Sequence, residues 1–324
     1  MAGDSVIVVV GAGICGLSAA RRLTAADRPV VVLERGLSAG GRSATRELAG
    51  GRFDTGAQFF TVRSEEFGRL ADHWLASGIA YEWCRGFDQP PAAPDGYPRY
   101  AGRGGMVALA RDLASSLDIR FGAAVTAIDP NGVVRLDDGT DISSRAVVLT
   151  PPARQSIALL DRGGAALPAS ARAALEAIRI EPVLAVLARL EHPSAVPPPG
   201  GVQLEDGAFS FVADNQMKGV SSVPAVTLHA TGRLSRQRWA EPDAALLGDL
   251  LRLATPWLGH EPIAAELVRW RHARPVVLEP RRCLVVDGEW GPLVFAGDAF
   301  GEARIEGATR SGWAAADEVL GRLG

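Results

Sequence analysis

The stretch SVIVVVGAGICG, at residues 5–16, decides the fold of this chain. Residues 5–10 form a continuous apolar run that ends at a glycine, which is typical of a strand buried in a parallel sheet. Residues 14–26 then have helical periodicity, and residues 29–33 are a second, β-branched run. Strand, helix and strand within about 30 residues make a βαβ unit, so the sequence predicts a Rossmann-type α/β fold.

Three glycines in the pattern GxGxxG occupy the turn between the first strand and the helix. Gly11 permits the tight turn, Gly13 lets backbone approach a pyrophosphate, and Gly16 lets the helix pack closely on the strand. The start of the helix offers unpaired amides to the phosphates. Glu34 ends the next strand about 20 residues on, where a carboxylate accepts ribose hydroxyl groups and repels a 2′-phosphate. The motif therefore favours FAD or NAD over NADP.

Segments near both termini favour FAD. Residues 40–42 (GGR) supply flexible backbone and a cation for a pyrophosphate, and the small residues of 54–58 (DTGAQ) let backbone pass beside a flat ring. Near the other end, an apolar strand at 293–296 is followed by Gly-Asp at 297–298, and residues 304–308 (RIEGA) precede the last helix. We therefore expect one domain built from both ends of the chain, with a second domain inserted.

The expected architecture is a parallel-sheet, Rossmann-type FAD-binding domain plus an inserted α+β substrate domain with a mostly antiparallel sheet. Further strands are expected at residues 120–128, 133–136, 146–149 and 292–296, and helices at 65–77, 106–116, 169–178, 244–253 and 309–323. The predicted FAD-binding domain comprises residues 1–75, 102–155 and 285–324, and the predicted substrate domain comprises residues 76–101 and 156–284.

Composition restricts the class of protein. The chain has 324 residues, 47% of them hydrophobic and 22% charged, with a net charge of −3, which argues against nucleic-acid or membrane partners. Its three cysteines form no CxxC pair and no complete disulfide set, and no signal peptide opens the sequence, so we expect a cytoplasmic protein. The five histidines show no metal-ligand spacing, and no metal is predicted.

Several of these motifs together resemble the flavin-dependent amine oxidase superfamily: GAGICG, GGR, GRFDTGAQFF, GGMVALARDLA, FAGDAF and IEGATRSG. Within this superfamily the chain more closely resembles bacterial renalase-like proteins, through DTGAQFFT, RYAGRGGM, LHAT and RWRHARP, over nearly its whole length. The resemblance implies FAD with its ring between two domains. Because no cysteine lies in residues 294–311, we expect the flavin to be bound non-covalently.

The resemblance also assigns cofactor contacts. It implies that Asp298 binds the ribityl chain, that amides near Ile305 and Glu306 face the pyrimidine end of the ring, and that Val125 contacts the adenine. The predicted cofactor-binding residues are Gly11, Ala12, Gly13, Ile14, Gly16, Glu34, Arg35, Gly41, Arg42, Gly56, Ala57, Gln58, Val125, Gly297, Asp298, Ile305 and Glu306.

Three residues are candidates for catalysis. His229 lies in the family-matching LHAT run, and Trp270 and Arg274 lie in RWRHARP. As functional residues, His229 lies in the pocket, Trp270 walls the flavin pocket and Arg274 meets an anionic substrate. As structural ones, His229 belongs to the core, and Trp270 and Arg274 lie at the edge of a half-buried strand whose aromatic ring is in the core. Arginines 233, 236 and 238 follow His229 and either hold phosphates or form a solvated face.

The sequence contains one GxGxxG, so we expect the substrate itself, and not a second nicotinamide domain, to deliver a hydride to the flavin. Dioxygen then takes the electrons and gives H2O2. Renalase-like proteins act on misreduced isomers of NAD(P)H, which are the expected donors. Ala299 and Thr309 stand where relatives carry Trp, which leaves the substrate open.

Two alternatives remain. The first is an amine oxidase or desaturase on another small molecule. Related amine oxidases place a lysine near flavin N5 through a water, but Lys218, the only lysine, lies in the loop-like stretch NQMKG, which argues against its being the equivalent. The second is a flavin-binding protein without turnover.

Overall fold

The computed structural model describes residues 6–87 and 95–324. The chain divides into two compact units. The first unit comprises the described residues up to Gly41 together with Ala110–Ile180 and Pro275–Gly324, and the second comprises the described residues of Arg42–Leu109 and Glu181–Arg274.

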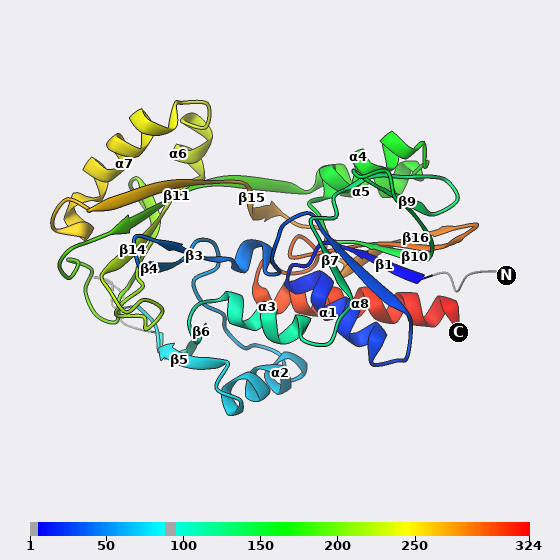
Figure 1. Cartoon of the computed structure of the whole chain (residues 1–324), viewed down its shortest axis with the longest axis horizontal. Coiled ribbons are helices and arrows are strands. Elements are labelled where there is room, and N and C mark those ends of the chain that lie inside the picture. Colours follow the sequence, from blue (N-terminus) through cyan, green and yellow to red (C-terminus); the bar gives the residue numbers. More distant parts are fainter. Residues whose placement is uncertain (1–5, 88–94) are drawn as a thin grey trace. The chain divides into compact units, whose positions relative to one another are not determined.

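A mainly parallel sheet forms the centre of the first unit, with strand order β16-β17-β10-β1-β2-β7 (Figure 1). Strands β17, β10, β1, β2 and β7 run parallel, β16 is antiparallel at one edge, and β9 pairs with both β10 and β8. The strands are β1 (Val6–Val10), β2 (Val30–Glu34), β7 (Ile119–Phe121), β8 (Val125–Ile128), β9 (Val133–Leu136), β10 (Asp141–Leu149), β16 (Cys283–Gly288) and β17 (Gly291–Ala296).

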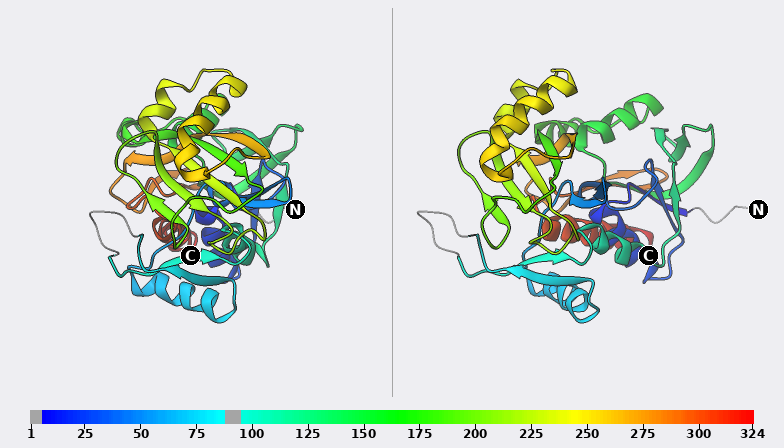
Figure 2. Two further views of the ribbon diagram at one scale, coloured as in Figure 1. Left: turned by 90° about the vertical axis from the view of Figure 1, so that its left-hand side faces the viewer. Right: turned by 60° about the vertical axis from the view of Figure 1, so that its left-hand side comes forward.

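Helices cover both faces of this sheet, which explains why its strands are continuous apolar runs. On one face, α1 and α8 lie side by side (Figures 1 and 2). They approach so closely that a Cβ on Gly312 would lie 2.2 Å from the carbonyl oxygen of Cys15. On the other face, α4 and α5 share a core with alternate residues of the strands, such as Val8 and Val147. The helices are α1 (Ile14–Thr24), α4 (Ala153–Gly163), α5 (Ala169–Ala177) and α8 (Ile305–Leu323).

The second unit is built on a five-stranded sheet of order β12-β13-β14-β11-β15, with antiparallel pairing from β12 through β11. Leu246, Leu250 and Leu258 of α7 pack on one face, which Figure 2 shows covered by that helix. Phe53 of the β3–β4 hairpin packs on the opposite face. These strands are β3 (Thr45–Leu48), β4 (Gly51–Asp54), β11 (Arg179–Arg189), β12 (Gly201–Gln203), β13 (Phe209–Asp214), β14 (Ala225–Ala230) and β15 (Ala264–Val277).

A second hairpin, β5–β6, completes the strands of this unit. The remaining elements are β5 (Ala80–Cys84), β6 (Arg99–Gly102), α2 (Glu65–Ala76), α3 (Val107–Ala114), α6 (Gly232–Gln237), α7 (Asp243–Leu258) and a short 3-10 helix (Gly41–Ser43). The predicted fold class, a Rossmann-type parallel sheet with a separate antiparallel sheet, is confirmed.

The compact units divide the chain at other positions than the predicted domains. Residues 42–75 and 102–109 belong to the second unit, because the β3–β4 hairpin packs on the antiparallel sheet and Met106 bonds to Asp54. Residues 156–180 and 275–284 belong to the first unit, because α4 and α5 pack on the parallel sheet. Residues 88–94 of the predicted segment 76–101 lie outside the described residues.

No helix among the described residues combines the length and the apolar character that a membrane span requires. No group of three or more His, Cys, Asp or Glu side chains among residues 6–87 and 95–324 is arranged to hold a metal ion.

Candidate functional site

The turn between β1 and α1 forms a backbone cradle. A Cβ on Gly16 would lie 2.0 Å from the carbonyl oxygen of Gly11, so the helix can approach the strand only without a side chain there. A Cβ on Gly13 would meet nothing within 4 Å, so space is open above this residue. Gly13 caps α1 without a side-chain hydrogen bond, and Ile14 opens a first turn that has no acidic residue. The first amides of α1 are therefore suited to bind a phosphate.

The carboxylate of Glu34 is held at the rim of this cradle. Its Oε2 accepts a hydrogen bond from the Ala12 amide at 2.8 Å, and its Oε1 accepts one from the Gly36 amide at 2.7 Å. Each oxygen keeps a lone pair for a ribose hydroxyl group. The neighbouring Arg35 is exposed.

Other predicted cofactor residues lie around the same edge of the sheet. The Gly40 amide donates to the carbonyl oxygen of Ala12 at 2.9 Å, and the position of a Gly41 Cβ is 3.5 Å from the Cα of Gly13. Gly297 follows the carboxyl end of β17, and its amide donates to Ser311 Oγ at 2.8 Å. Because β17, β10, β1 and β2 are parallel, their carboxyl ends share one edge, where α/β sheets bind ligands.

The remaining predicted residues of the first unit have these positions. Asp298 is half-buried after β17, Ile305 and Glu306 open α8, and Val125 opens β8. The cap of α8, Arg304, makes no side-chain hydrogen bond to the helix. The open space over Gly13, the uncapped start of α1 and the fixed Glu34 carboxylate all fit the adenosine diphosphate part of FAD.

Ala299 and Thr309 are both buried in the first unit. Ala299 belongs to the core cluster of the parallel sheet, and Thr309 Oγ1 donates to the carbonyl oxygen of Ile305 at 3.0 Å. A small residue and a hydroxyl bonded to its own helix thus occupy these two positions.

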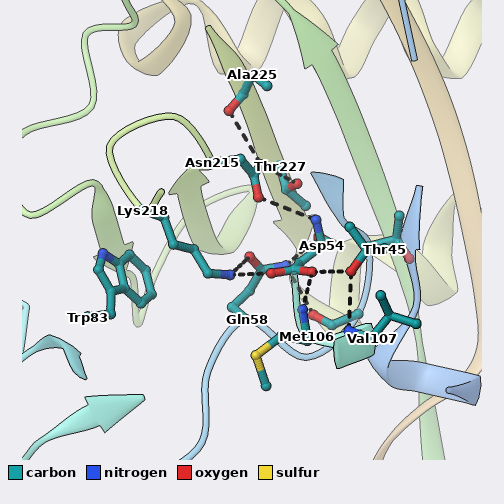
Figure 3. Close-up of polar contacts among 12 residues, drawn as sticks. Thr45, Asp54, Gln58, Trp83, Met106, Val107, Asn215, Lys218, Ala225 and Thr227 are labelled. Carbon is teal, nitrogen blue, oxygen red and sulfur yellow. Dashed lines mark hydrogen bonds and ion pairs between the residues drawn. The ribbon is translucent and has the colours of Figure 1, made fainter. Parts of the chain in front are cut away.

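The second unit contains a buried polar network centred on Asp54, at the end of β4 (Figure 3). Its Oδ2 accepts a hydrogen bond from Lys218 Nζ at 2.7 Å, and the side chains of both residues are 0% exposed. Its Oδ1 accepts from Thr45 Oγ1 at 2.6 Å and from the Met106 amide at 2.7 Å. The carboxylate thus has three donors.

Gln58 and Trp83 complete the surroundings of Lys218. The Gln58 amide nitrogen donates to the carbonyl oxygen of Asp54 at 2.6 Å, and Gln58 Oε1 accepts from Lys218 Nζ at 3.1 Å. The Lys218 ammonium lies 5.2 Å from the centre of the Trp83 ring (Figure 3). Burial lowers the pKa of Lys218, and the charge of Asp54 opposes that effect. The geometry is that of a buried ion pair.

Asn215 connects this network to the antiparallel sheet. Its Oδ1 accepts from the Asp54 amide at 3.3 Å, and its Nδ2 donates to Thr227 Oγ1 at 3.0 Å and to the carbonyl oxygen of Ala225 at 3.3 Å. Thr227 and Ala225 both belong to β14. The network is therefore tied to the strand that carries His229.

The carbonyl oxygen of Thr55 brings two predicted catalytic residues together. It lies 3.1 Å from His229 Nε2 and accepts a hydrogen bond from Trp270 Nε1 at 2.8 Å. A carbonyl oxygen only accepts, so we assign the proton of the histidine ring to Nε2, which makes Nδ1 an acceptor. Burial, with a contribution from the Lys218 charge, lowers the pKa of His229 to about 4. The ring is therefore neutral at pH 7.

Arg274 has a different partner. Its Nη2 lies 3.1 Å from Glu181 Oε2, and Arg236 Nη1 pairs with the other oxygen of the same carboxylate. Arg238 pairs with Glu241 and Asp249. Carboxylates thus already neutralise part of the arginine cluster, and the anion-binding role of Arg274 stays a prediction.

The last predicted group joins the 3-10 helix to the turn that follows β4. The Ala57 amide donates to the carbonyl oxygen of Arg42 at 2.9 Å, and a Cβ on Gly56 would lie 2.0 Å from that oxygen. Arg42 Nη1 donates to the carbonyl oxygen of Ala273 at 3.2 Å. Arg42, Gly56 and Ala57 are therefore neighbours, and their contact with the cofactor stays a prediction.

Sequence reasoning missed Asp54, Lys218 and Asn215 as parts of one site. Asp54 and Lys218 are 164 residues apart, and no periodicity relates them. One signal was available: the chain has 34 lysine and arginine residues, and Lys218 is its only lysine. A single lysine among so many arginines points to a position that needs a compact ammonium group in place of a guanidinium.

Comparisons with known proteins agree with this architecture. The family model of flavin containing amine oxidoreductases matches residues 63–320, and that of the NAD(P)-binding Rossmann-like domain matches residues 9–74. A putrescine oxidase of Kocuria rosea is 38% identical over 90 residues, and polyamine oxidase 1 of Oryza sativa subsp. japonica is 42% identical over 97 residues. Each alignment covers 28% of this chain and 18% of the relative, so less than a fifth of either relative's length is matched.

Two solved structures are similar over nearly the whole chain. A putrescine oxidase bound to putrescine superposes with a TM-score of 0.75 at 15% identity, covering 98% of this chain and 99% of that one. The cyclohexylamine oxidase of Brevibacterium oxydans IH-35A superposes with a TM-score of 0.75 at 17% identity, covering 99% and 100%. At these identities the likeness shows the fold.

Proposed function

Since the chain belongs to the family of flavin-containing amine oxidoreductases, with FAD as its cofactor, we propose that it is a renalase-like oxidase of small nitrogen-containing donors. The first candidates are misreduced isomers of dihydro-NAD(P). When bound, FAD supplies the chemistry of accepting a hydride and passing the electrons to dioxygen, which yields H2O2.

The observation that carries this proposal is the neutral ring of His229. An alkylamine has a pKa of about 10.4 and is an ammonium ion at pH 7. Transfer of its proton to His229, a base whose pKa is about 4, would be uphill by roughly 9 kcal/mol. The nitrogen of a dihydropyridine carries no proton to remove. A donor of that class therefore suits the acid–base properties of the site best.

Other residues of the site contribute by orientation. With its proton on Nε2, His229 offers Nδ1 as an acceptor for an N–H or O–H group of the donor. The indole N–H of Trp270 is already bonded to Thr55, which fixes the ring. Lys218 is paired with Asp54 and Gln58, so it is not available as a mobile base.

A second candidate is an oxidase that takes up the neutral form of an amine. It is favoured by the fold shared with the putrescine and cyclohexylamine oxidases. The two proposals differ in the effect of pH. Reduction by an amine should become about tenfold faster for each pH unit between 7 and 9, because the neutral amine increases by that factor, whereas reduction by a dihydropyridine should stay flat.

Anaerobic mixing of the FAD-loaded protein with 2- and 6-dihydro-NAD, putrescine or cyclohexylamine tests both proposals. We expect the dihydro-NAD isomers to bleach the visible flavin absorbance, and readmitted dioxygen to restore it with one H2O2 per turnover. Bleaching by the amines alone would replace the first proposal with the second. A flavin that no donor reduces would indicate a binding protein without turnover.

A further inference from the structure

We propose that Lys218 is a positioning residue: through the turn at residues 54–58 it holds the Thr55 carbonyl in place and thereby fixes the Nε2–H tautomer of His229. The inference concerns the second unit alone and does not depend on which donor is oxidised. It gives a role to a fully buried charged side chain that the proposed oxidation does not use.

Lys218 contacts both ends of that turn. Its ammonium lies 2.7 Å from Asp54 Oδ2 at the first residue and 3.1 Å from Gln58 Oε1 at the last. The Gln58 amide nitrogen also donates to the carbonyl oxygens of Asp54 and Gly56, at 2.6 and 3.1 Å. One side chain thus clamps a five-residue turn whose second residue, Thr55, presents the shared carbonyl oxygen.

The clamp closes a ring of hydrogen bonds with β14. From Thr227 the ring passes to Asn215 and then to the Asp54 amide (Figure 3). Through Thr55 it continues to His229, on the same strand as Thr227. Asn215 and Lys218 belong to the same loop, between β13 and β14. This loop therefore makes two hydrogen bonds with Asp54 at the end of β4, one to its amide and one to its carboxylate. Tyr81 Oη, in turn, donates to the carbonyl oxygen of Lys218. A shift of Lys218 would therefore move the acceptor of His229.

Every N–H bond of the Lys218 ammonium group has a partner within the protein. Its three N–H bonds are matched by Asp54, Gln58 and the face of Trp83, and its side chain is 0% exposed. A group with every donor committed to the protein orients its neighbours and does not exchange protons with a substrate. This distinguishes a positioning role from a reacting one.

The test is the tautomer of His229 in the FAD-loaded protein, read by NMR after labelling histidine with ¹⁵N. The signal of His229 is identified by its loss in His229→Gln. In the parent protein we expect one tautomer with the proton on Nε2. In Lys218→Met we expect a mixture of both tautomers and a flavin reduction about 100-fold slower, as follows when a reacting group is misplaced by about 1 Å.

The same spectrum contains its own control. His192 and His260 lie together in the second unit, where His260 Nε2 is 3.2 Å from the carbonyl oxygen of His192. Their signals should be the same in Lys218→Met if the fold is intact. A His229 that keeps its single tautomer while these signals are unchanged would overturn the proposal, and a loss of rate in that case would make Lys218 a reacting residue.

A double variant covers the case in which Lys218→Met does not fold. In Asp54→Asn/Lys218→Met no charge is stranded, and the Asn carbonyl can still accept from Thr45 and Met106. The clamp on Gln58 is still missing, so we expect a folded protein with mixed His229 tautomers. A single Nε2–H tautomer in this folded variant would also overturn the proposal.

Discussion

The cradle of the first unit and the buried network of the second unit solve the same problem, holding polar groups in place, by opposite means. The cradle consists of backbone: amides of α1, glycines without side chains, and one carboxylate held by two amides. The network consists mainly of side chains from the β3–β4 hairpin and from the loop after β13, which an ion pair joins, with one backbone amide from Met106. Changes should therefore affect the cradle through cofactor affinity and the network through stability.

The largest effect is expected from removing one partner of the ion pair. Lys218→Met leaves the Asp54 carboxylate buried without its cation, which should lower the free energy of unfolding by about 3–5 kcal/mol. Urea denaturation of the parent, Lys218→Met and Asp54→Asn/Lys218→Met measures it. The double variant should lose clearly less than the single one, because it buries no unpaired charge. Equal losses would mean that packing, and not charge, holds this region.

A pH effect on stability should come from His229, whose pKa burial lowers from 6.5 to about 4. Between these values the unfolded chain binds the proton and the folded protein does not, so stability rises with pH. The contribution is complete above pH 6.5 and is lost as pH falls through 4, by up to about 3 kcal/mol. His229→Gln keeps a donor for Thr55 and should remove this part of the slope. The measurement is the free energy of unfolding of the parent and of His229→Gln between pH 4 and pH 7. The same dependence on pH in both proteins would contradict the expectation.

The cradle could be predicted because its signal is local. GxGxxG and the carboxylate at Glu34 lie within one βαβ unit, and each glycine has a steric reason visible in the motif. The strands expected at 146–149 and 292–296 lie in β10 and β17, with Pro292 already inside β17. The helix expected at 169–178 is α5, one residue shorter.

The errors have physical causes. The single strand expected at 120–128 is two strands, β7 and β8, because Gly122 has a φ of +69° and ends the first of them. The last helix begins at Ile305 and not at residue 309. Its first turn contains Gly307, a residue that is unfavourable in helices and therefore hides the helical pattern. No side chain fits there, because a Cβ would lie 1.9 Å from the carbonyl oxygen of Glu302. The network depends on tertiary contacts such as that between Asp54 and Lys218, which no local pattern encodes.

Two glycines of the cradle should separate cofactor binding from folding. Gly16→Ala places a Cβ 2.0 Å from the Gly11 carbonyl oxygen and should cost about 1–3 kcal/mol of stability. Gly13→Ala meets nothing within 4 Å, so the apoprotein should keep its stability while the Kd for FAD rises about tenfold, or roughly 1.4 kcal/mol. Urea denaturation and fluorescence titration with FAD measure the two effects. A Gly13→Ala protein that binds FAD with the affinity of the parent would show that no FAD phosphate is bound at this cradle.

The smallest effect is expected at the rim of the cradle. Glu34→Gln keeps one oxygen for an amide hydrogen bond but sets an NH2 group against the other amide, of Ala12 or Gly36. One charge-assisted bond is lost, and the Kd for FAD should rise about three- to tenfold, roughly 0.7–1.4 kcal/mol. Glu47→Gln, at an exposed position of β3, makes the same change of charge and should leave the Kd unaltered. An equal response of both variants would show that net charge, and not a ribose contact at the end of β2, sets the affinity, and the specificity of the cradle would then rest on its glycines alone.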